Sequence, residues 1–156
     1  MSDEAHAVVL GPGEGETLVN ALGGSVTFKA RTAETGGSMA VMETTVPAGE
    51  GPPLHLHANE DEIVYVLEGD LQFRLGADLH PAPSGAFVFI PRGLHHTWRN
   101  IGDVPARLLI VFTPSGMERF FELFAARGSR AGDASAFAAT GSEVGMEVVG
   151  PPLAEE

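Results

Sequence analysis

The chain has 156 residues and a mass of 16.3 kDa, enough for one domain with a sizeable hydrophobic core. It contains no cysteine, which excludes disulfides, thiol nucleophiles and thiolate metal ligands, so a metal would need histidine and carboxylate ligands. The formal net charge of −12 argues against nucleic acid and anionic membranes as partners. Lys29 is the only lysine, so Schiff-base chemistry is not expected either.

The N-terminus is acidic and lacks the basic and apolar regions of a secretory signal, and no apolar run is long enough to span a membrane. These features predict a cytoplasmic protein. The chain has no internal repeat and no composition shift that would mark a linker. We therefore expect a single domain over residues 1–156, with a barrel at about residues 25–113.

Glycine and proline are spread along the chain and divide it into short apolar segments, a pattern typical of an all-β sandwich or barrel. The expected strands lie at residues 25–30, 39–46, 62–67, 70–75, 86–90, 95–99 and 107–113, with weaker candidates at 7–10 and 17–22. Glu68-Gly69-Asp70 predicts a tight hairpin, because glycine adopts positive φ without steric cost. Residues 100–105 predict another turn.

One segment has a helical period, at about residues 116–127. Its apolar residues recur at i, i+3, i+4 and i+7, namely Met117, Phe120, Phe121 and Phe124. Ser115 and Glu118 have the spacing of a capping box, and Gly128 can end the helix. We expect this helix to pack on the outside of the barrel. A loop with a short helix and a last strand are expected at residues 129–139 and 143–149.

Four side chains that can bind a metal lie between Gly49 and Asn100, with glycine and proline around them. They are three histidines and one glutamate, namely His55, His57, Glu62 and His96. Three imidazole nitrogens and one carboxylate oxygen suit a mid-row divalent metal. The sequence therefore indicates a metal site.

Strand periodicity places these side chains on one face. His55 and His57 are two residues apart, so both point the same way in an extended segment. Glu62 shares a face with the apolar residues two and four positions later in its strand. The same alternation puts His96 and Trp98 inside the barrel and His95 outside.

Several neighbouring residues compete for these roles. Glu60 and Asp61 are alternatives to Glu62. Glu62 is preferred because it begins the strand and its spacing from the two histidines fits the motif described below, whereas Glu60 would fit only a shorter gap. Three arginines could hold an anionic substrate, although surface ion pairs are the more ordinary role for Arg92, Arg99 and Arg107. Four apolar residues could line a pocket or simply form the core, namely Trp98, Phe73, Phe28 and Met42. His6 and His80 are expected to be exposed.

The two stretches resemble the two motifs of the cupin superfamily at every defined position. The first is Gly49-x5-His55-x-His57-x4-Glu62-x6-Gly69, and the second is Gly85-x5-Pro91-x-Gly93-x2-His96-x3-Asn100. The resemblance is strong over about residues 38–113. It implies a small double-stranded β-helix, or jelly-roll, barrel that binds one divalent ion, Fe, Mn, Ni, Co or Zn, through His55, His57, Glu62 and His96. In this resemblance the glycines and Pro91 shape turns, Asn100 belongs to a turn, and a cupin that works without metal is the alternative.

Further segments look like small bacterial cupins resembling quercetin 2,3-dioxygenase. They are Gly51-Pro52-Pro53-Leu54-His55-Leu56-His57, Tyr65-Val66-Leu67-Glu68-Gly69, Phe89-Ile90-Pro91-Arg92-Gly93 and Phe112-Thr113-Pro114-Ser115-Gly116. This resemblance implies a dioxygenase that acts on a flavonol-like or other small hydroxylated substrate, with dioxygen as co-substrate and Glu62 as both ligand and base. Alternatives are a metal-dependent isomerase, cyclase or lyase that uses no oxygen, and a non-catalytic small-molecule-binding cupin. A homodimer is also expected for a small cupin.

Overall fold

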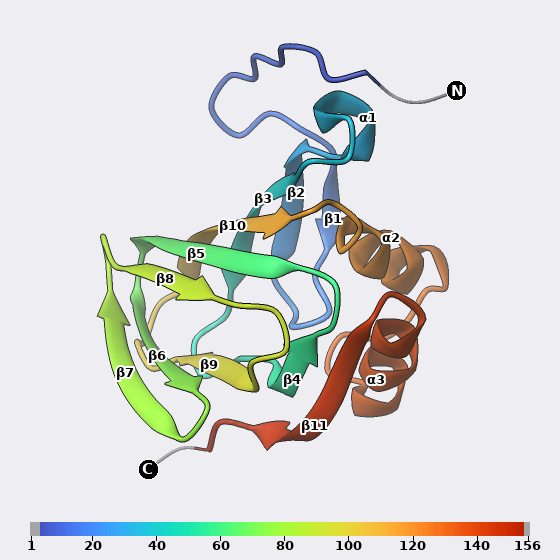
Figure 1. Cartoon of the computed structure of the whole chain (residues 1–156). Coiled ribbons are helices and arrows are strands. Elements are labelled where there is room, and N and C mark those ends of the chain that lie inside the picture. The colour runs from blue at the N-terminus through green and yellow to red at the C-terminus, as the bar shows by residue number, and fades with distance from the viewer. Residues whose placement is uncertain (1–3, 155–156) are drawn as a thin grey trace.

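The computed structural model describes residues 4–154, which form two antiparallel β-sheets packed face to face with helices along one side (Figure 1). The strands of the larger sheet are β1 (Thr17–Val19), β2 (Ser25–Ala30), β3 (Ala40–Val46), β10 (Ala106–Thr113), β5 (Asp61–Glu68) and β8 (Phe87–Ile90), in this spatial order. Those of the smaller sheet are β11 (Met146–Pro152), β4 (Pro53–His57), β9 (His96–Asn100), β6 (Asp70–Leu75) and β7 (Asp78–Pro83). The predicted all-β fold with C-terminal helices is confirmed.

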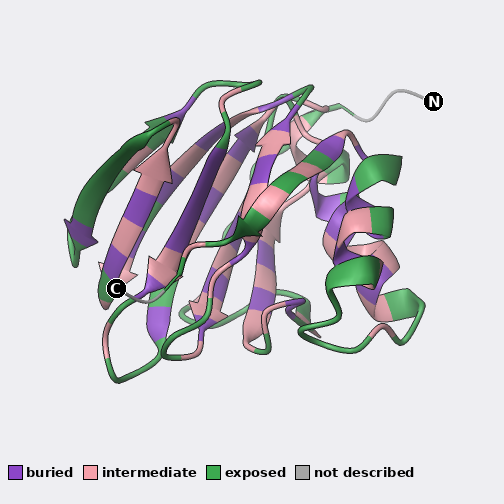
Figure 2. Cartoon of the chain, turned by 90° about the horizontal axis from the view of Figure 1, so that it is seen from below, coloured by how far each residue is buried: buried purple, intermediate pink, exposed green. Residues whose placement is uncertain are grey.

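The core lies between the sheets. Strands β3, β5 and β10 alternate between buried and more exposed residues, and the purple and lighter bands of Figure 2 show this alternation. Their inward residues are apolar for most of each strand, since Met42, Val64 and Leu108 are all fully buried. Burial of such side chains contributes roughly 1.5–3 kcal/mol each to folding. The alternation that places Glu62 inside therefore follows from the core itself.

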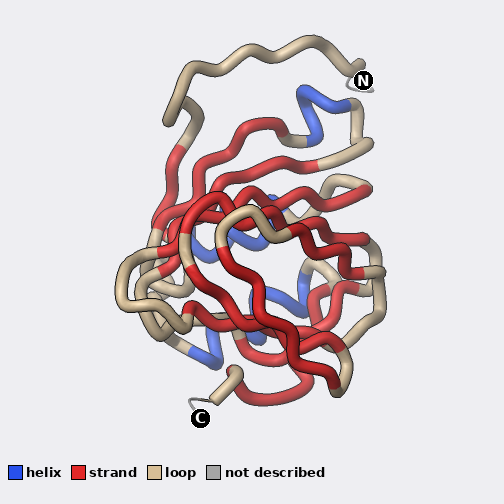
Figure 3. The backbone as a smooth tube through the Cα atoms, turned by 90° about the vertical axis from the view of Figure 1, so that its left-hand side faces the viewer, coloured by secondary structure: helices blue, strands red, loops and turns tan. Residues whose placement is uncertain are grey.

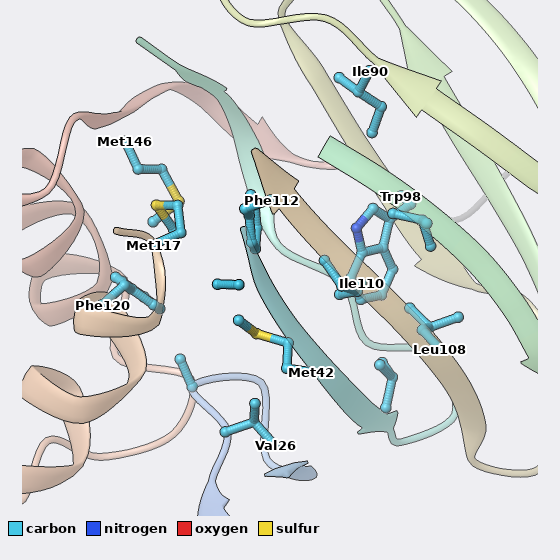
Figure 4. Close-up of a cluster of buried hydrophobic side chains, with 14 of the residues drawn as sticks. Val26, Met42, Ile90, Trp98, Leu108, Ile110, Phe112, Met117, Phe120 and Met146 are labelled. Carbon is cyan, nitrogen blue, oxygen red and sulfur yellow. The ribbon is translucent and has the colours of Figure 1, made fainter. Parts of the chain in front are cut away.

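Two helices close the side of the sandwich between the edge strands β1 and β11, namely α2 (Glu118–Ala126) and α3 (Ala134–Glu143). A third, α1 (Thr32–Thr35), is a single turn. Phe120 of α2 packs edge-on against Phe137 of α3, with ring centroids 4.9 Å apart. In Figure 4, Met117, Met146 and Phe120 lie on the helix side of Phe112. Among residues 4–154, none of the helices is long and apolar enough to cross a bilayer.

Some predicted elements differ from the structure. Residues 7–10 are not a strand, and the strand expected over residues 17–22 is limited to Thr17–Val19. Strand β7 was not predicted, because Pro81 and Pro83 interrupt its pattern. An edge strand tolerates proline, and β7 pairs with β6 alone. Strand β4 and the helical turn α1 were also missed, and the last helix and strand lie several residues later than expected.

The hairpin predicted at Gly69 is wrong. Strands β5 and β6 belong to different sheets, so the chain crosses from one layer to the other at this glycine. Figure 3 shows the strands of both sheets in red. Gly69 has a φ of 120°, and a Cβ there would lie 2.6 Å from the Cβ of Ala106. Glycine is therefore required by close packing as well as by its backbone conformation.

The predicted capping box of α2 is also wrong. The helix has no side-chain cap at its first turn, and the hydroxyl of Ser115 instead makes a 2.7 Å hydrogen bond with that of Thr32. The Glu118 carboxylate accepts hydrogen bonds from the backbone N–H and the hydroxyl of Thr32, each 2.9 Å long. Both side chains thus tie the start of α2 to the α1 segment. The predicted end of the helix is confirmed, since Gly128 has a positive φ of 62° just after it.

Candidate metal centre

The structure brings the four predicted side chains together inside the barrel. Strand β4 supplies His55 and His57, β5 supplies Glu62, and β9 supplies His96. Each offers one ligand atom, and these atoms all lie within 4.8 Å of one another. All four residues are buried, with exposed fractions between 1% and 5%. A buried group of three imidazoles and one carboxylate can bind a divalent metal ion.

The strands that carry these residues are held closely against each other. His55 and His96 are direct cross-strand partners in the β4–β9 pair. Just before β4 the chain passes against β9 at Gly51, where a Cβ would lie 1.9 Å from the carbonyl oxygen of Trp98. The hydroxyl of Thr97 adds a 2.6 Å hydrogen bond to the Pro52 carbonyl. Any larger residue at Gly51 would push β4 and its two histidines away from β9.

Backbone carbonyls set the orientation of two imidazoles. Nδ1 of His55 lies 2.7 Å from the Pro53 carbonyl oxygen, and Nδ1 of His96 lies 2.9 Å from that of Leu94. A carbonyl oxygen can only accept, so each Nδ1 carries the hydrogen. In the neutral rings, the lone pair then belongs to Nε2, and Nε2 of His96 faces the Glu62 carboxylate. Such hydrogen bonds are the usual outer support of metal-binding histidines.

The nitrogen and oxygen atoms at the centre of the group do not satisfy one another when the three imidazoles are neutral. Oε1 of Glu62 lies 3.2 Å from Nε2 of His57 and 3.2 Å from Nε2 of His96. With Nδ1 of His96 protonated, a neutral His96 would direct a lone pair at this carboxylate oxygen, and only a proton or a metal ion between them removes the repulsion. Both ring nitrogens of His57 are buried without a hydrogen-bond partner. The donor set and these unsatisfied atoms fit a bound cation.

The pKa shifts of His55 and Glu62 suit metal binding, whereas that of His96 goes the other way. Burial, together with the neighbouring imidazoles of His96 and His57, lowers the pKa of His55 to about 3, so this ring is neutral. Burial alone would raise the pKa of the Glu62 carboxyl, but the adjacent imidazoles reverse this effect and hold it well below its usual range. Burial opposes a charge on His96, yet the hydrogen bond to Glu62 raises its pKa. Neutral imidazole and ionised carboxylate are the forms that bind metals.

The metal-binding group opens on a cavity of about 50 Å³ whose walls are mainly apolar. The walls come from both sheets and from the helices, and consist of Asn20, Leu22, Thr44, Pro52, His55, His57, Glu62, Trp98, Ile110, Phe112, Met117, Phe120, Phe121, Phe137 and Met146. Among residues 4–154, no lysine or arginine lines this cavity. Phe112 contacts the site directly, because its ring centroid is 5.1 Å from that of His57.

The other histidines and carboxylates that were considered as metal ligands lie outside the group of four. His95 is exposed, as strand alternation predicted, and His6 and His80 are exposed too. Glu60 is buried but outside the group of four, and one of its carboxylate oxygens, Oε1, has no hydrogen-bond partner. Burial raises its pKa to about 7. Asp61 accepts hydrogen bonds from the backbone and side chain of Arg92.

The structure also shows where the predicted substrate-binding arginines, the pocket candidates and Asn100 lie. Arg107 pairs with Glu43, and the Nε of Arg99 donates to the Gly49 carbonyl, so neither arginine belongs to the cavity. Trp98 lines the cavity, whereas the other three pocket candidates are core residues, namely Phe28, Phe73 and Met42. Asn100 ends β9, and its side-chain amide holds the following turn through the Val104 carbonyl and the Gly102 N–H.

Sequence reasoning missed several residues of the cavity wall. Phe137 and Met146 come from α3 and β11, far from both motifs in the chain, and no sequence signal points from them to the site. Thr44 could have been found, since it is a polar residue at an inward position of β3, between buried Met42 and Val46.

Comparison with known proteins gives a consistent result. Residues 42–112, which contain both motifs, match the family model described as "Cupin domain". A solved RmlC-like cupin from Shewanella frigidimarina NCIMB 400 has a TM-score of 0.62 and 16% sequence identity, with 76% of this chain and 98% of that chain covered. At this identity the likeness concerns the fold alone.

Two proteins of Streptomyces are similar in sequence. "Protein SchB" of Streptomyces halstedii is 38% identical over 80 residues, which are 51% of this chain and 56% of SchB. "Polyketide synthase CurC" of Streptomyces cyaneus is 35% identical over 66 residues, which are 42% of this chain and 43% of CurC. The chain thus matches only about half of the length of these relatives. The match of residues 42–112 to the cupin family model, together with the buried His₃Glu group, supports a cupin domain in this part of the chain.

Proposed function

We propose that the protein is a metal-dependent enzyme that acts on a small hydroxylated aromatic substrate, with oxygen insertion as the first candidate reaction. The observation that carries the proposal is a His₃Glu donor set that opens on a cavity walled by phenylalanine, tryptophan and methionine. Apolar walls with a few polar groups are typical of sites for organic ligands. Because no cationic side chain lines the cavity among residues 4–154, a substrate with a phosphate or a second carboxylate would be buried without a counter-charge.

The cavity must widen to admit such a substrate. Its volume of about 50 Å³ is smaller than the roughly 150 Å³ cavity that accommodates benzene in another protein. Met117 and Met146 can change rotamer at low cost, because methionine is unbranched and flexible. The three ligand-bearing strands are each paired on both sides within their sheets, so the helix side is the wall that can yield.

A divalent metal at this site would act as a Lewis acid, acidify a substrate hydroxyl bound beside the four ligands, and leave positions open for substrate. The chain itself supplies the rest. Glu62 is the proposed base: its buried carboxylate belongs to the group of four and would take the hydroxyl proton, whose release leaves the substrate oxygen negative. Phe112 and the helix-side aromatics exclude water from that oxygen and hold the substrate ring by aromatic packing.

The dioxygenase candidate is supported by the segments that resemble quercetin 2,3-dioxygenase-like cupins. Its test is oxygen consumption by the protein loaded in turn with Fe, Mn, Ni, Co or Zn, on a panel of flavonols and catechols. We expect uptake that depends on metal and substrate, and products that gain both oxygen atoms. Turnover that continues at the same rate without oxygen would rule this reaction out.

A second candidate is a cyclase, isomerase or lyase that uses the same deprotonation without oxygen. The similarity to a protein named polyketide synthase favours it, because poly-oxo chains also carry acidic enol hydroxyls on an apolar body. The mass of the product separates the two reactions, since cyclisation adds no oxygen. A metal-free protein that gains neither metal nor activity from any of the five ions would instead support a non-catalytic binding role.

We also propose that the protein is a cytoplasmic homodimer. Three aromatic side chains on the outer face of the larger sheet offer an apolar surface for a second copy, with exposed fractions of 61% for Phe87, 48% for Phe89 and 40% for Tyr65. Light scattering of the purified protein tests the dimer, and a monomeric mass at micromolar concentration would contradict it.

A further inference from the structure

Thr44 is a buried polar residue without a partner. It occupies an inward position of β3, where the other inward residues are Ala40, Met42 and Val46, and it is 2% exposed. Its hydroxyl oxygen makes no hydrogen bond within the protein. A buried, unpaired hydroxyl is destabilising, and valine would fill the same space without that cost. Packing of the core therefore does not explain why this position carries a hydroxyl.

The register of the larger sheet shows how Thr44 is placed relative to the metal-binding group. Phe112 of β10 is paired with Glu62 on one side and with Ala40 on the other, so these three residues lie at one level. Thr44 is four residues further along β3, about 13 Å in the strand direction. Both Glu62 and Thr44 nevertheless line the same cavity.

The cavity is consequently elongated, with polar groups at two levels and apolar walls between them. Ile110 and Trp98 line the intervening stretch, and Asn20 is a second buried polar residue in the wall. Once the helix side of the cavity has widened, a molecule bound there would meet the metal-binding group with one end and Thr44 with the other.

We propose that Thr44 is a specificity-determining residue that binds a second oxygen of the substrate. Building on the proposed function, this makes the preferred substrate an elongated, uncharged aromatic molecule with one hydroxyl at the metal-binding group and another hydroxyl or carbonyl at the far end. The substrate oxygen makes the hydrogen bond with the Thr44 hydroxyl that no protein group provides. Recognition then favours the doubly oxygenated molecule over its singly oxygenated analogue, because the analogue leaves the hydroxyl unpaired.

Two probes that differ by one hydroxyl test this inference, namely 3-hydroxyflavone and 3,4′-dihydroxyflavone. Their dissociation constants are measured by anaerobic titration on the zinc-loaded protein, so that no oxygen is consumed. We expect the wild type to bind the dihydroxy probe about 3–10-fold more tightly. Thr44→Val should reduce this ratio to about one, chiefly by weakening binding of the dihydroxy probe, whereas Thr44→Ser should retain the preference.

Thermal unfolding of the ligand-free variants is an independent readout. Thr44→Val should raise the midpoint by about 2–4 °C, because it removes an unpaired hydroxyl and keeps the side-chain shape. A lower midpoint would show that the hydroxyl is already hydrogen-bonded, for instance to a buried water, and would overturn the inference.

The binding results separate this inference from the proposed function. If the wild type binds both probes equally, or if Thr44→Val keeps the preference, the role of Thr44 is refuted while the proposed substrate class stands. If the zinc-loaded wild type binds neither probe, the aromatic substrate class fails and the role of Thr44 fails with it.

Discussion

The two walls of the cavity are built differently. The ligand wall consists of strands β4, β5 and β9, each hydrogen-bonded to a neighbour on both sides, and it carries every side chain of the His₃Glu group. The helix wall consists of α2, α3 and the start of β11, and contributes only apolar side chains to the cavity, namely Met117, Phe120, Phe121, Phe137 and Met146.

This difference separates metal binding from the shape of the cavity. The ligand wall holds charged and polar groups in fixed positions, which a metal site requires. The helix wall can change its side chains, and with them the size and shape of the cavity, without moving a ligand. Substitutions in the two walls should therefore have different effects.

The largest effect is expected in the ligand wall. His57→Ala removes one of four ligands, so metal content after purification should fall from about one ion per chain to nearly none, as measured by atomic emission. His95→Ala is the matched control, because His95 is adjacent to His96 but exposed, and it should keep its metal. Unchanged metal content in His57→Ala would refute the assignment of the site.

The next largest effect is expected in the helix wall. Phe120 is 2% exposed and packs against three other aromatic rings, with centroid distances of 5.2 Å to Phe121, 5.9 Å to Phe124 and 4.9 Å to Phe137. Phe120→Ala should lower the free energy of unfolding by about 3–5 kcal/mol, measured by urea denaturation at equilibrium. Phe120→Leu should cost less, about 1.5 kcal/mol. Both variants should still bind metal, and its loss would show that the two walls are not independent.

The sequence predicted the ligand wall far better than the helix wall. The strands of the barrel and the inward direction of Glu62 and His96 follow from an alternation that is local in sequence. The four candidate ligands were named from their chemistry and from the resemblance of their spacing to the two cupin motifs. Their assembly needed only that β4, β5 and β9 enclose one interior.

The parts that could not be predicted depend on contacts between distant segments. The crossing between sheets at Gly69 is set by its contact with Ala106, 37 positions later in the chain. The start of α2 is held by Thr32, which no local capping rule includes. Phe137 reaches the cavity through a helix of mainly small residues, whose sequence resembles a loop as much as a helix.

Glu60 lies where the two walls meet, and the smallest of the expected effects concerns its substitution. It ends the loop before β5, and a Cβ on Gly116, just before α2, would lie 3.4 Å from its Oε2. Burial raises the pKa of Glu60 to about 7, whereas its ordinary value is 4.5. Between these values the unfolded chain is ionised and the folded protein keeps its proton, so this group lowers stability as the pH rises from 4.5 to 7. Its cost is complete above pH 7 and absent below 4.5.

Glu60→Gln removes this titration and should therefore stabilise the protein at pH 8. We expect a gain of about 1–3 kcal/mol in the free energy of unfolding there, which declines to nearly zero at about pH 4.5, measured by urea denaturation at several pH values. Glu147→Gln is the control, because Glu147 is an exposed glutamate on β11 and its substitution should change stability little at any pH. The metal content of Glu60→Gln should match the wild type, since Glu60 lies outside the group of four. A gain that is equal at pH 5 and pH 8 would show that Glu60 is already ionised in the folded protein at pH 5, and would contradict the raised pKa.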